Sequence, residues 1–317
     1  MVADAPLIVL VGATASGKTA LSLRLAEEFG GEIVSCDSVA VYRGMEIGTA
    51  KPSLEERGMV PHHMIDVAWP DEACTAGDYS RMARESLAGI VERGHVPIVA
   101  GGTGLYLRAL IDGLFPSPPQ QDGLRDRLRK TAATRSAAYL HRILKRLDSV
   151  AAEKIHANDV SKVVRAIEVS LTAQQPLTEQ WEKGRDALTG FRILRLGLNP
   201  ERKRLYERIN TRAAAMFDRG LIEETERLVE QYTYDCRPLS SLGYAEAVAV
   251  LQGQMTRDEA VSAAQQGHRN YAKRQGTWFR REPDMHWLTG CGEDDAVWEE
   301  ARELVEEHLK QNVPRGS

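Results

Sequence analysis

Eight residues near the start of the chain have the types and spacing of a loop that binds phosphate groups. They match the pattern G-x-x-x-x-G-K-[ST] and are Gly12, Ala13, Thr14, Ala15, Ser16, Gly17, Lys18 and Thr19. In such a loop, backbone N–H groups converge on phosphate oxygens, and the start of the following helix adds positive potential. Lys18 supplies a cation, and the hydroxyl of Thr19 is suited to bind Mg²⁺. The pattern predicts binding of a diphosphate or triphosphate without identifying the substrate.

A second group that could do chemistry is the carboxylate of Asp37, at the end of a short apolar segment. The carboxyl ends of parallel strands face the crevice in which such sheets bind their ligands. Asp37 could therefore ligate a metal ion, accept a proton from a nucleophile or cap the next turn, and its position favours a catalytic role. Proteins that hydrolyse nucleotides usually carry an acid at the end of another strand. Here the third apolar segment, 97–100, is followed by Gly-Gly-Thr-Gly instead.

Short apolar strands that alternate with helices must hold these groups in place. Residues 7–11 (LIVLV) form a continuous apolar run, which is typical of a buried parallel strand. Leu21, Leu25 and Phe29 recur at helical spacing before the glycine pair at 30–31. Together with the phosphate-binding loop, this alternation predicts an α/β fold with a P-loop NTPase-like parallel sheet core flanked by helices.

A Pro-rich segment at 115–123 interrupts this pattern. The residues from about 124 to 190 read as basic helices without a strand signal, and a strand-like stretch returns at 193–198. We therefore interpret the middle of the chain as an all-helical insertion in the α/β core. The expected bounds are 1–114 and 193–312 for the core and 115–192 for the insertion, with 313–317 (VPRGS) as a tag remnant.

Composition limits where the protein works and what it binds. The formal net charge is -4, so nucleic acid would have to bind a local basic surface rather than the field of the whole molecule. The four cysteines do not have the spacing of a metal site. No apolar run approaches the roughly 20 residues of a membrane helix, and the N-terminus lacks a signal-peptide pattern. We expect a cytoplasmic monomer without a membrane partner.

Four segments of the chain together resemble the bacterial tRNA dimethylallyltransferases. They are 12–19 (GATASGKT), 37–52 (DSVAVYRGMEIGTAKP), 101–106 (GGTGLY) and 272–279 (AKRQGTWF). Weaker matches lie between them, in the order of the family, at 62–66 (HHMID), 164–168 (VRAIE) and 242–244 (LGY). The ordered set extends from about residue 7 to residue 290, which is nearly the whole chain.

The resemblance implies transfer of the dimethylallyl group from dimethylallyl diphosphate to N6 of the adenine immediately 3′ of the anticodon, with Mg²⁺ as cofactor. By analogy with the family, Asp37 would be the general base toward that amine, and Thr103 would touch the target nucleotide. The phosphate-binding loop, with Lys18, would hold the leaving diphosphate, and Arg212 would lie near it. The exocyclic amine is a poor nucleophile, so a base must remove its proton as the new bond forms.

Basic and aromatic residues are interleaved at 268–281, where five Lys or Arg residues accompany three aromatic rings. Cations can meet phosphates while rings stack on unpaired bases, so this segment predicts contact with RNA. A second basic stretch lies in the helical insertion. With the resemblance added, the residues expected to contact a tRNA anticodon stem-loop are Asp37, Ser38, Val39, Ala40, Thr103, Arg125, Ser161, Lys162, Arg165, Gly243, Tyr244, Arg269, Lys273, Arg274, Gln275, Trp278 and Arg280.

Some residues differ from those that the family usually has at the same positions. Ala40 stands where the family often has Gln, and Lys162 where Arg is common. Arg208, one helical turn before Arg212, could face the same anion or the solvent.

Three other functions fit parts of this sequence pattern. A small-molecule kinase would fit the phosphate-binding loop equally well, but the third strand lacks its acid. An adenylate isopentenyltransferase would do the same chemistry on a free nucleotide, and the long basic insertion argues against it. An inactive RNA-binding protein would not need an intact Lys18, Thr19 and Asp37.

Overall fold

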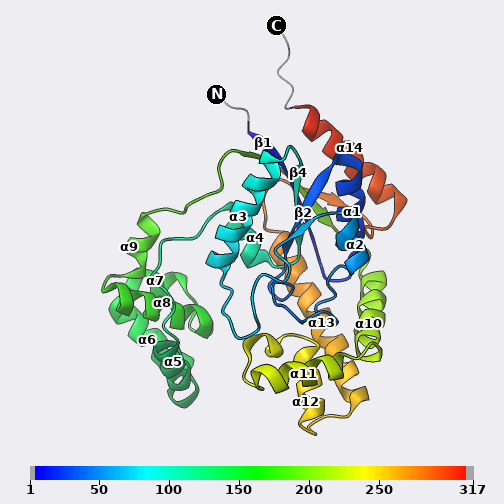
Figure 1. The fold of residues 1–317 in the computed structure, drawn as a ribbon. Coiled ribbons are helices and arrows are strands. Elements are labelled where there is room, and N and C mark those ends of the chain that lie inside the picture. Colours follow the sequence, from blue (N-terminus) through cyan, green and yellow to red (C-terminus); the bar gives the residue numbers. More distant parts are fainter. Residues whose placement is uncertain (1–3, 312–317) are drawn as a thin grey trace. The chain divides into compact units, whose positions relative to one another are not determined.

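The computed structural model describes residues 4–311, and a six-stranded parallel sheet forms the centre of the larger of its two compact units (Figure 1). Across the sheet the strands follow the order β3-β2-β4-β1-β5-β6. Their bounds are β1 Ala5–Gly12, β2 Gly31–Cys36, β3 His62–His63, β4 Val96–Gly101, β5 Phe191–Leu198 and β6 Met285–Leu288. β1 pairs with β4 on one side and β5 on the other, so β1 is an inner strand of the sheet. The parallel sheet flanked by helices confirms the predicted fold class.

Helices cover both faces of the sheet, which explains why its inner strands are almost entirely apolar. Along β1, Leu7 and Val9 belong to one core, whereas Ile8 and Leu10 belong to another. The helices that complete the core around Ile8 and Leu10 are α1 Lys18–Phe29 and α14 Asp295–Lys310. The core around Leu7 and Val9 is completed chiefly by α3 Ala76–Glu92, α4 Gly104–Ile111 and α13 Arg257–Phe279.

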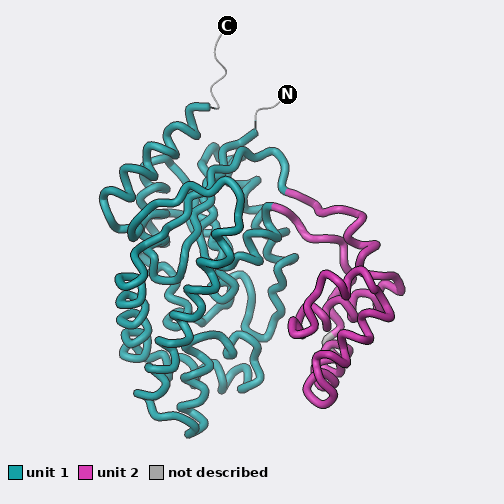
Figure 2. Tube along the Cα trace, turned by 180° about the vertical axis from the view of Figure 1, so that it is seen from behind, with its two compact units in different colours: residues 1–111, 188–317 teal, residues 112–187 magenta. Residues whose placement is uncertain are grey.

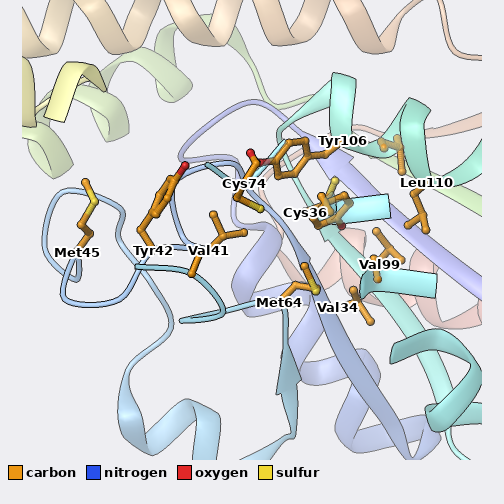
Figure 3. Packing of buried hydrophobic residues seen from close by; sticks show 14 of the residues in the cluster. Val34, Cys36, Val41, Tyr42, Met45, Met64, Cys74, Val99, Tyr106 and Leu110 are labelled. Carbon is orange, nitrogen blue, oxygen red and sulfur yellow. The ribbon is translucent and has the colours of Figure 1, made fainter. Parts of the chain in front are cut away.

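Figure 3 shows part of the core around Leu7 and Val9. Cys36 of β2, Val99 of β4 and Tyr106 of α4 are buried in it, and the Tyr106 hydroxyl donates a hydrogen bond to the backbone oxygen of Cys74 at 3.0 Å. Cys36 is the last residue of β2. The residue that follows, Asp37, therefore stands at the edge of a tightly packed region, which fixes its backbone.

Among the described residues, the larger unit also contains the helices α2 Leu54–Met59, α10 Arg202–Asp218, α11 Leu221–Tyr232 and α12 Tyr244–Leu251, and the 3₁₀ turn η1 Arg237–Ser240. Helix α10 packs on α13, and α11 packs on α12. Among the described residues, no helix combines the length and the apolarity needed to cross a membrane.

Residues 112–187 form the second compact unit, which is all helical (Figure 2). Its helices are α5 Asp122–Arg135, α6 Ala137–Leu147, α7 Ser149–Lys154, α8 Val160–Ala173 and α9 Leu177–Glu182. They enclose a separate apolar core that includes Leu140, Leu144, Val163 and Ile167. This unit therefore has an interior of its own.

The bounds of the second unit differ by a few residues from the expected insertion at 115–192. Helix α4 ends at Ile111, before the Pro-rich segment, and the backbone N–H of Leu188 donates to the oxygen of Ile111 at 2.8 Å. β5 then begins at Phe191, so the strand starts earlier than its apolar pattern suggests. The expected tag remnant, 313–317, lies outside the described residues.

Candidate functional site

The phosphate-binding loop connects β1 to α1 at the carboxyl end of the sheet. Helix α1 begins at Lys18, so its first backbone N–H groups, which have no partner within the helix, face the loop. Gly17 has a φ of +91°, a conformation that residues with a side chain rarely adopt. The loop that the sequence pattern predicted thus has the backbone geometry of an anion site.

Two cations lie beside this loop. The Nζ of Lys18 donates to the backbone oxygen of Ala13 at 2.8 Å, and Arg212 of α10 donates to the hydroxyl of Thr14. Burial, together with the charge of Arg212, lowers the pKa of Lys18 to about 8. Burial also lowers the pKa of Arg212. Because burial and mutual repulsion disfavour these two charges, an anion bound beside them would be strongly held.

Asp37 follows β2 and faces the same cations. Its Oδ1 accepts hydrogen bonds from the backbone N–H groups of Val39 at 2.8 Å and Ala40 at 3.2 Å. Its charge raises the pKa of both Lys18 and Arg212, although burial prevails in each. One carboxylate oxygen therefore caps the turn, and none of the described residues forms a hydrogen bond with the other. Asp37 acts as a cap and also lines the pocket described below.

Thr103 is held next to the turn that begins at Asp37. It follows β4, and its backbone N–H donates to the oxygen of Cys36 at 3.1 Å. Its hydroxyl accepts a hydrogen bond from the backbone N–H of Ser38 at 3.0 Å. The chain segments that leave β2 and β4 are thereby tied together. Two residues that the sequence assigned to one site, although far apart along the chain, are adjacent in the structure.

Gln275 of α13 connects the phosphate-binding loop to the segment after β4. Its Oε1 accepts a hydrogen bond from the backbone N–H of Thr14 at 2.8 Å, and its Nε2 donates to the oxygen of Gly102 at 2.8 Å. The side chain is buried, so both of its polar atoms are occupied within the protein. The sequence placed Gln275 among the RNA contacts. The structure instead gives it the task of fixing the loop.

Most of the residues described so far line one pocket of about 120 Å³, although Thr103 is not among its lining residues. The predicted residues that the structure brings together there are Thr14, Lys18, Thr19, Asp37, Ala40, Arg212 and Gln275. Tyr271 of α13 also lines it, although the sequence did not single it out as a site residue. Burial raises the pKa of Tyr271 to about 12, so its phenol stays protonated. The pocket therefore combines cations, one carboxylate and a neutral hydroxyl donor.

A buried glutamate that sequence reasoning missed shapes the wall of this pocket. Glu224 of α11 accepts hydrogen bonds from the backbone N–H groups of Glu46 at 3.1 Å and Ile47 at 3.0 Å. It thereby fixes the segment that continues into 49–52, which lines the pocket. Glu224 also accepts from the Tyr244 hydroxyl at 2.5 Å. The ring of Tyr244 is fully buried, so the predicted RNA contact cannot be made by its side chain.

The basic and aromatic segment of α13 presents some of its side chains to solvent. Lys273, Arg274 and Arg280 are exposed, whereas Trp278 is half-buried with the guanidinium of Arg108 stacked 4.5 Å from its ring centroid. Arg269 donates to Asn210 and Gln266. Lys273 and Arg280 also line a second pocket, of about 550 Å³. RNA contact by this segment stays a prediction.

In the smaller unit, two of the predicted RNA-binding arginines have a structural partner. The buried carboxylate of Glu168 accepts from Arg125 at 2.6 Å and from Arg165 at 2.9 Å. The Arg125 side chain is only 13% exposed, whereas that of Lys162 is 72% exposed. Ser161, beside Lys162 at the start of α8, is exposed as well. Of the four predicted contacts on this unit, Ser161 and Lys162 are therefore the exposed ones, although the Lys162 ammonium is paired with Asp159 at 2.5 Å.

Among the predicted residues that remain, three belong to turns. Ser38 and Val39 follow Asp37 and have their backbone N–H groups bonded to Thr103 and Asp37. Gly243 precedes α12 with a φ of +89°, and its N–H donates to Glu246 at 2.7 Å. Their backbone hydrogen bonds stabilise turns of the larger unit, and their contact with RNA stays a prediction.

The donor set of the pocket fits Mg²⁺ held mainly by a substrate. Among the residues whose side chains the structure describes, no group of three or more His, Cys, Asp or Glu could hold a metal ion. Mg²⁺ usually keeps several waters and binds one or two protein oxygens together with substrate phosphates. The Thr19 hydroxyl lines the pocket and would supply such an oxygen.

Comparison with known proteins gives consistent matches over nearly the whole chain. The model of the family described as IPP transferase matches residues 40–282. A tRNA dimethylallyltransferase of Koribacter versatilis (strain Ellin345) is 60% identical over 302 residues, which cover 95% of this chain and 98% of that protein. The crystal structure of a tRNA isopentenylpyrophosphate transferase from Bacillus halodurans superposes with a TM-score of 0.71, at 35% identity and 97% coverage of each chain. A eukaryotic dimethylallyltransferase acting on tRNA gives a TM-score of 0.81 at 26% identity, covering 98% of this chain and 81% of that chain.

Gln275→Glu should weaken binding of inorganic pyrophosphate by roughly tenfold or more. It removes the donor to Gly102 and adds a negative charge beside the phosphate-binding loop. Isothermal titration calorimetry in the presence of Mg²⁺ measures the affinity. The matched control is Gln266→Glu, an exposed position of the same helix, which should bind as the wild type does. Equal affinities in the two variants would contradict the role given to Gln275.

Proposed function

Because the chain belongs to the IPP transferase family, we propose that it is a tRNA dimethylallyltransferase. It transfers the dimethylallyl group of dimethylallyl diphosphate to N6 of the adenine immediately 3′ of the anticodon and releases diphosphate. The observation that carries this proposal is the pocket in which Lys18 and Arg212 lie with the Asp37 carboxylate. Cations for a leaving anion and a base for an amine are the two requirements of the reaction.

In the reaction, the bond between the allylic carbon and the diphosphate oxygen breaks, and the electron pair leaves with the diphosphate. Negative charge therefore grows on the leaving group. Lys18, Arg212 and the backbone N–H groups at the start of α1 are fixed before the reaction, so they stabilise this charge without reorganising. Mg²⁺ bound by the diphosphate and Thr19 would add Lewis acid stabilisation of the same charge.

The amine must lose a proton as its nitrogen bonds to the allylic carbon. The Asp37 carboxylate can accept that proton through the oxygen that is not engaged in capping the turn. The two backbone hydrogen bonds to Oδ1 hold the carboxylate in one orientation, which favours transfer along a fixed direction. The nearby Thr103 hydroxyl would orient the adenine, since Ser38 holds it beside this turn.

The adenine would have to leave its stack and enter the pocket, which favours an unpaired loop of RNA as the substrate. The partner is therefore the anticodon stem-loop of tRNA, gripped by exposed side chains of α13 and by Ser161 and Lys162 of the smaller unit. We place the enzyme in the cytoplasm with its tRNA substrate, as a monomer.

The test is incubation with dimethylallyl diphosphate, Mg²⁺, and either an unmodified tRNA transcript or free AMP and ATP. Label should appear on tRNA alone, at the adenine after the anticodon, and only when Mg²⁺ is present. Label on the free nucleotide would point to an adenylate isopentenyltransferase. Transfer of the γ-phosphate of ATP to a small molecule would point to a kinase, and either result would refute the proposal.

Asp37→Asn should lower kcat by roughly 10²–10⁴-fold, because the amide cannot accept the proton of the amine. The amide oxygen can still accept the two backbone hydrogen bonds, so the turn should persist. Single-turnover transfer to tRNA measures the effect, and filter binding shows that the affinity for tRNA is retained. A wild-type rate would exclude Asp37 as the base.

The value of kcat/KM for dimethylallyl diphosphate should fall as the pH rises above about 8. The folded protein holds the pKa of Lys18 well below its usual value, to about 8, so this cation is lost as the pH passes that point. Below it Lys18 is charged, and the profile should be flat on that account. Lys18→Arg keeps its charge and should lack this decline, whatever its absolute rate. A wild-type profile that stays flat well above pH 8 would contradict the assignment.

A further inference from the structure

The turn between β6 and α14 touches the outer side of the phosphate-binding loop. The backbone N–H of Gly292 donates to the oxygen of Ser16 at 2.9 Å. A Cβ on Gly17 would meet the Glu293 carboxylate and the Gly292 nitrogen, and one on Gly292 would meet the Gly17 oxygen. The two backbones are therefore in direct contact, although they lie far apart in the sequence. Gly292 and Glu293 are not among the lining residues of the Asp37 pocket, so this contact supports the loop from outside that pocket.

Arg208 of α10 joins the loop and the turn through one planar group. Its Nε donates to the backbone oxygen of Ala15 at 2.8 Å, and its Nη2 donates to Oε1 of Glu293 at 2.6 Å. Ala15 has a φ of +63°, which a residue with a side chain rarely adopts. The guanidinium thus holds the least favourable backbone position of the loop in place.

Arg208 and Arg212 have different hydrogen-bond partners, although they are one helical turn apart on α10. Arg212 lines the pocket with Asp37 and bonds the Thr14 hydroxyl. Arg208 has two of its donors committed to protein acceptors, and a carboxylate already offsets its charge. Both arginines line a pocket of about 490 Å³ with Lys18 and Glu293, but only Arg212 also lines the pocket of Asp37. The hydrogen bonds of Arg208 to Ala15 and Glu293 therefore favour a role within the protein.

We propose that Arg208 and Glu293 are positioning residues for the transfer reaction. Together they clamp the phosphate-binding loop in its anion-binding conformation, with Arg208 acting through the Ala15 carbonyl and not as a ligand of the substrate. This inference rests on the proposed function for the identity of the anion, a diphosphate. Its consequence is that an acidic residue near an anion site, which on charge alone would oppose binding, supports binding.

The test is binding of inorganic pyrophosphate with Mg²⁺ to the full chain carrying Glu293→Gln, measured by calorimetry. The substitution keeps the size of the side chain and removes the charge that holds Arg208. The clamp predicts that affinity falls roughly tenfold, since the loss of a charge-assisted hydrogen bond loosens the loop. If Arg208 were instead a direct ligand, removal of the competing carboxylate would leave affinity unchanged or raise it. Either of those results would overturn the proposal.

Arg208→Lys gives a second measurement of the same kind. Lysine keeps the charge but lacks the planar fork that reaches two acceptors, so the clamp predicts weaker binding here as well. Wild-type affinity in this variant would contradict the clamp. In both variants the melting temperature without ligand should stay near that of the wild type, whereas the rise caused by pyrophosphate should shrink.

Arg204→Ala is the matched control. Arg204 lies one turn earlier on α10 and pairs with Asp294, between β6 and α14, at 2.7 Å. Among the described residues, its hydrogen bonds do not reach the phosphate-binding loop. Its affinity for pyrophosphate should equal that of the wild type. Equal losses in Arg204→Ala and Glu293→Gln would indicate general loosening of the turn and would overturn the proposal. If the wild type modifies tRNA while Glu293→Gln binds pyrophosphate normally, the clamp fails and the proposed function stands.

Discussion

The larger unit depends on keeping two positive charges and one negative charge together in a partly buried pocket. Lys18 and Arg212 repel each other, burial disfavours both, and Asp37 offsets only part of this cost. The start of α1 adds further positive potential at the same place. A departing diphosphate gains negative charge, so its attraction to this cluster grows along the reaction. The cluster therefore favours the transition state over the bound substrate, which is the condition for catalysis.

Holding these charges in place requires partners that are remote in the sequence. Gln275 fixes the phosphate-binding loop from α13, and Glu224 fixes the opposite pocket wall from α11. Both side chains are buried and bond to backbone groups. Such groups are costly to leave without partners, so each contact has one well-defined geometry. Helices α11 and α13 thus hold in place a site whose Lys18 and Asp37 belong to the first part of the chain.

Features that depend on local sequence patterns could be predicted from the sequence, whereas contacts between remote segments could not. The phosphate-binding loop and the apolar strands are local patterns, and both predict the fold and the position of Asp37 correctly. The roles of Gln275 and Tyr244 were less accessible, because a motif shows which residues accompany each other but not which side chains are buried. Glu224 gave no signal, since an acid on an amphipathic helix usually faces solvent. For Arg208 the helical spacing left two interpretations, the anion of Arg212 or the solvent, whereas its partners in the structure are the Ala15 oxygen and Glu293. In the smaller unit, the same limit applies to Arg125, whose charge is matched inside the protein.

The hydrogen bond between Leu188 and Ile111 brings together the two points at which the chain leaves and re-enters the larger unit. A module with adjoining ends can be lengthened, shortened or exchanged without stretching the sheet to which it is attached. The smaller unit also has its own interior, so its surface can change without disturbing the cores on either side of β1. Substitutions in the smaller unit can therefore accumulate while the pocket of Lys18 and Asp37 stays unchanged.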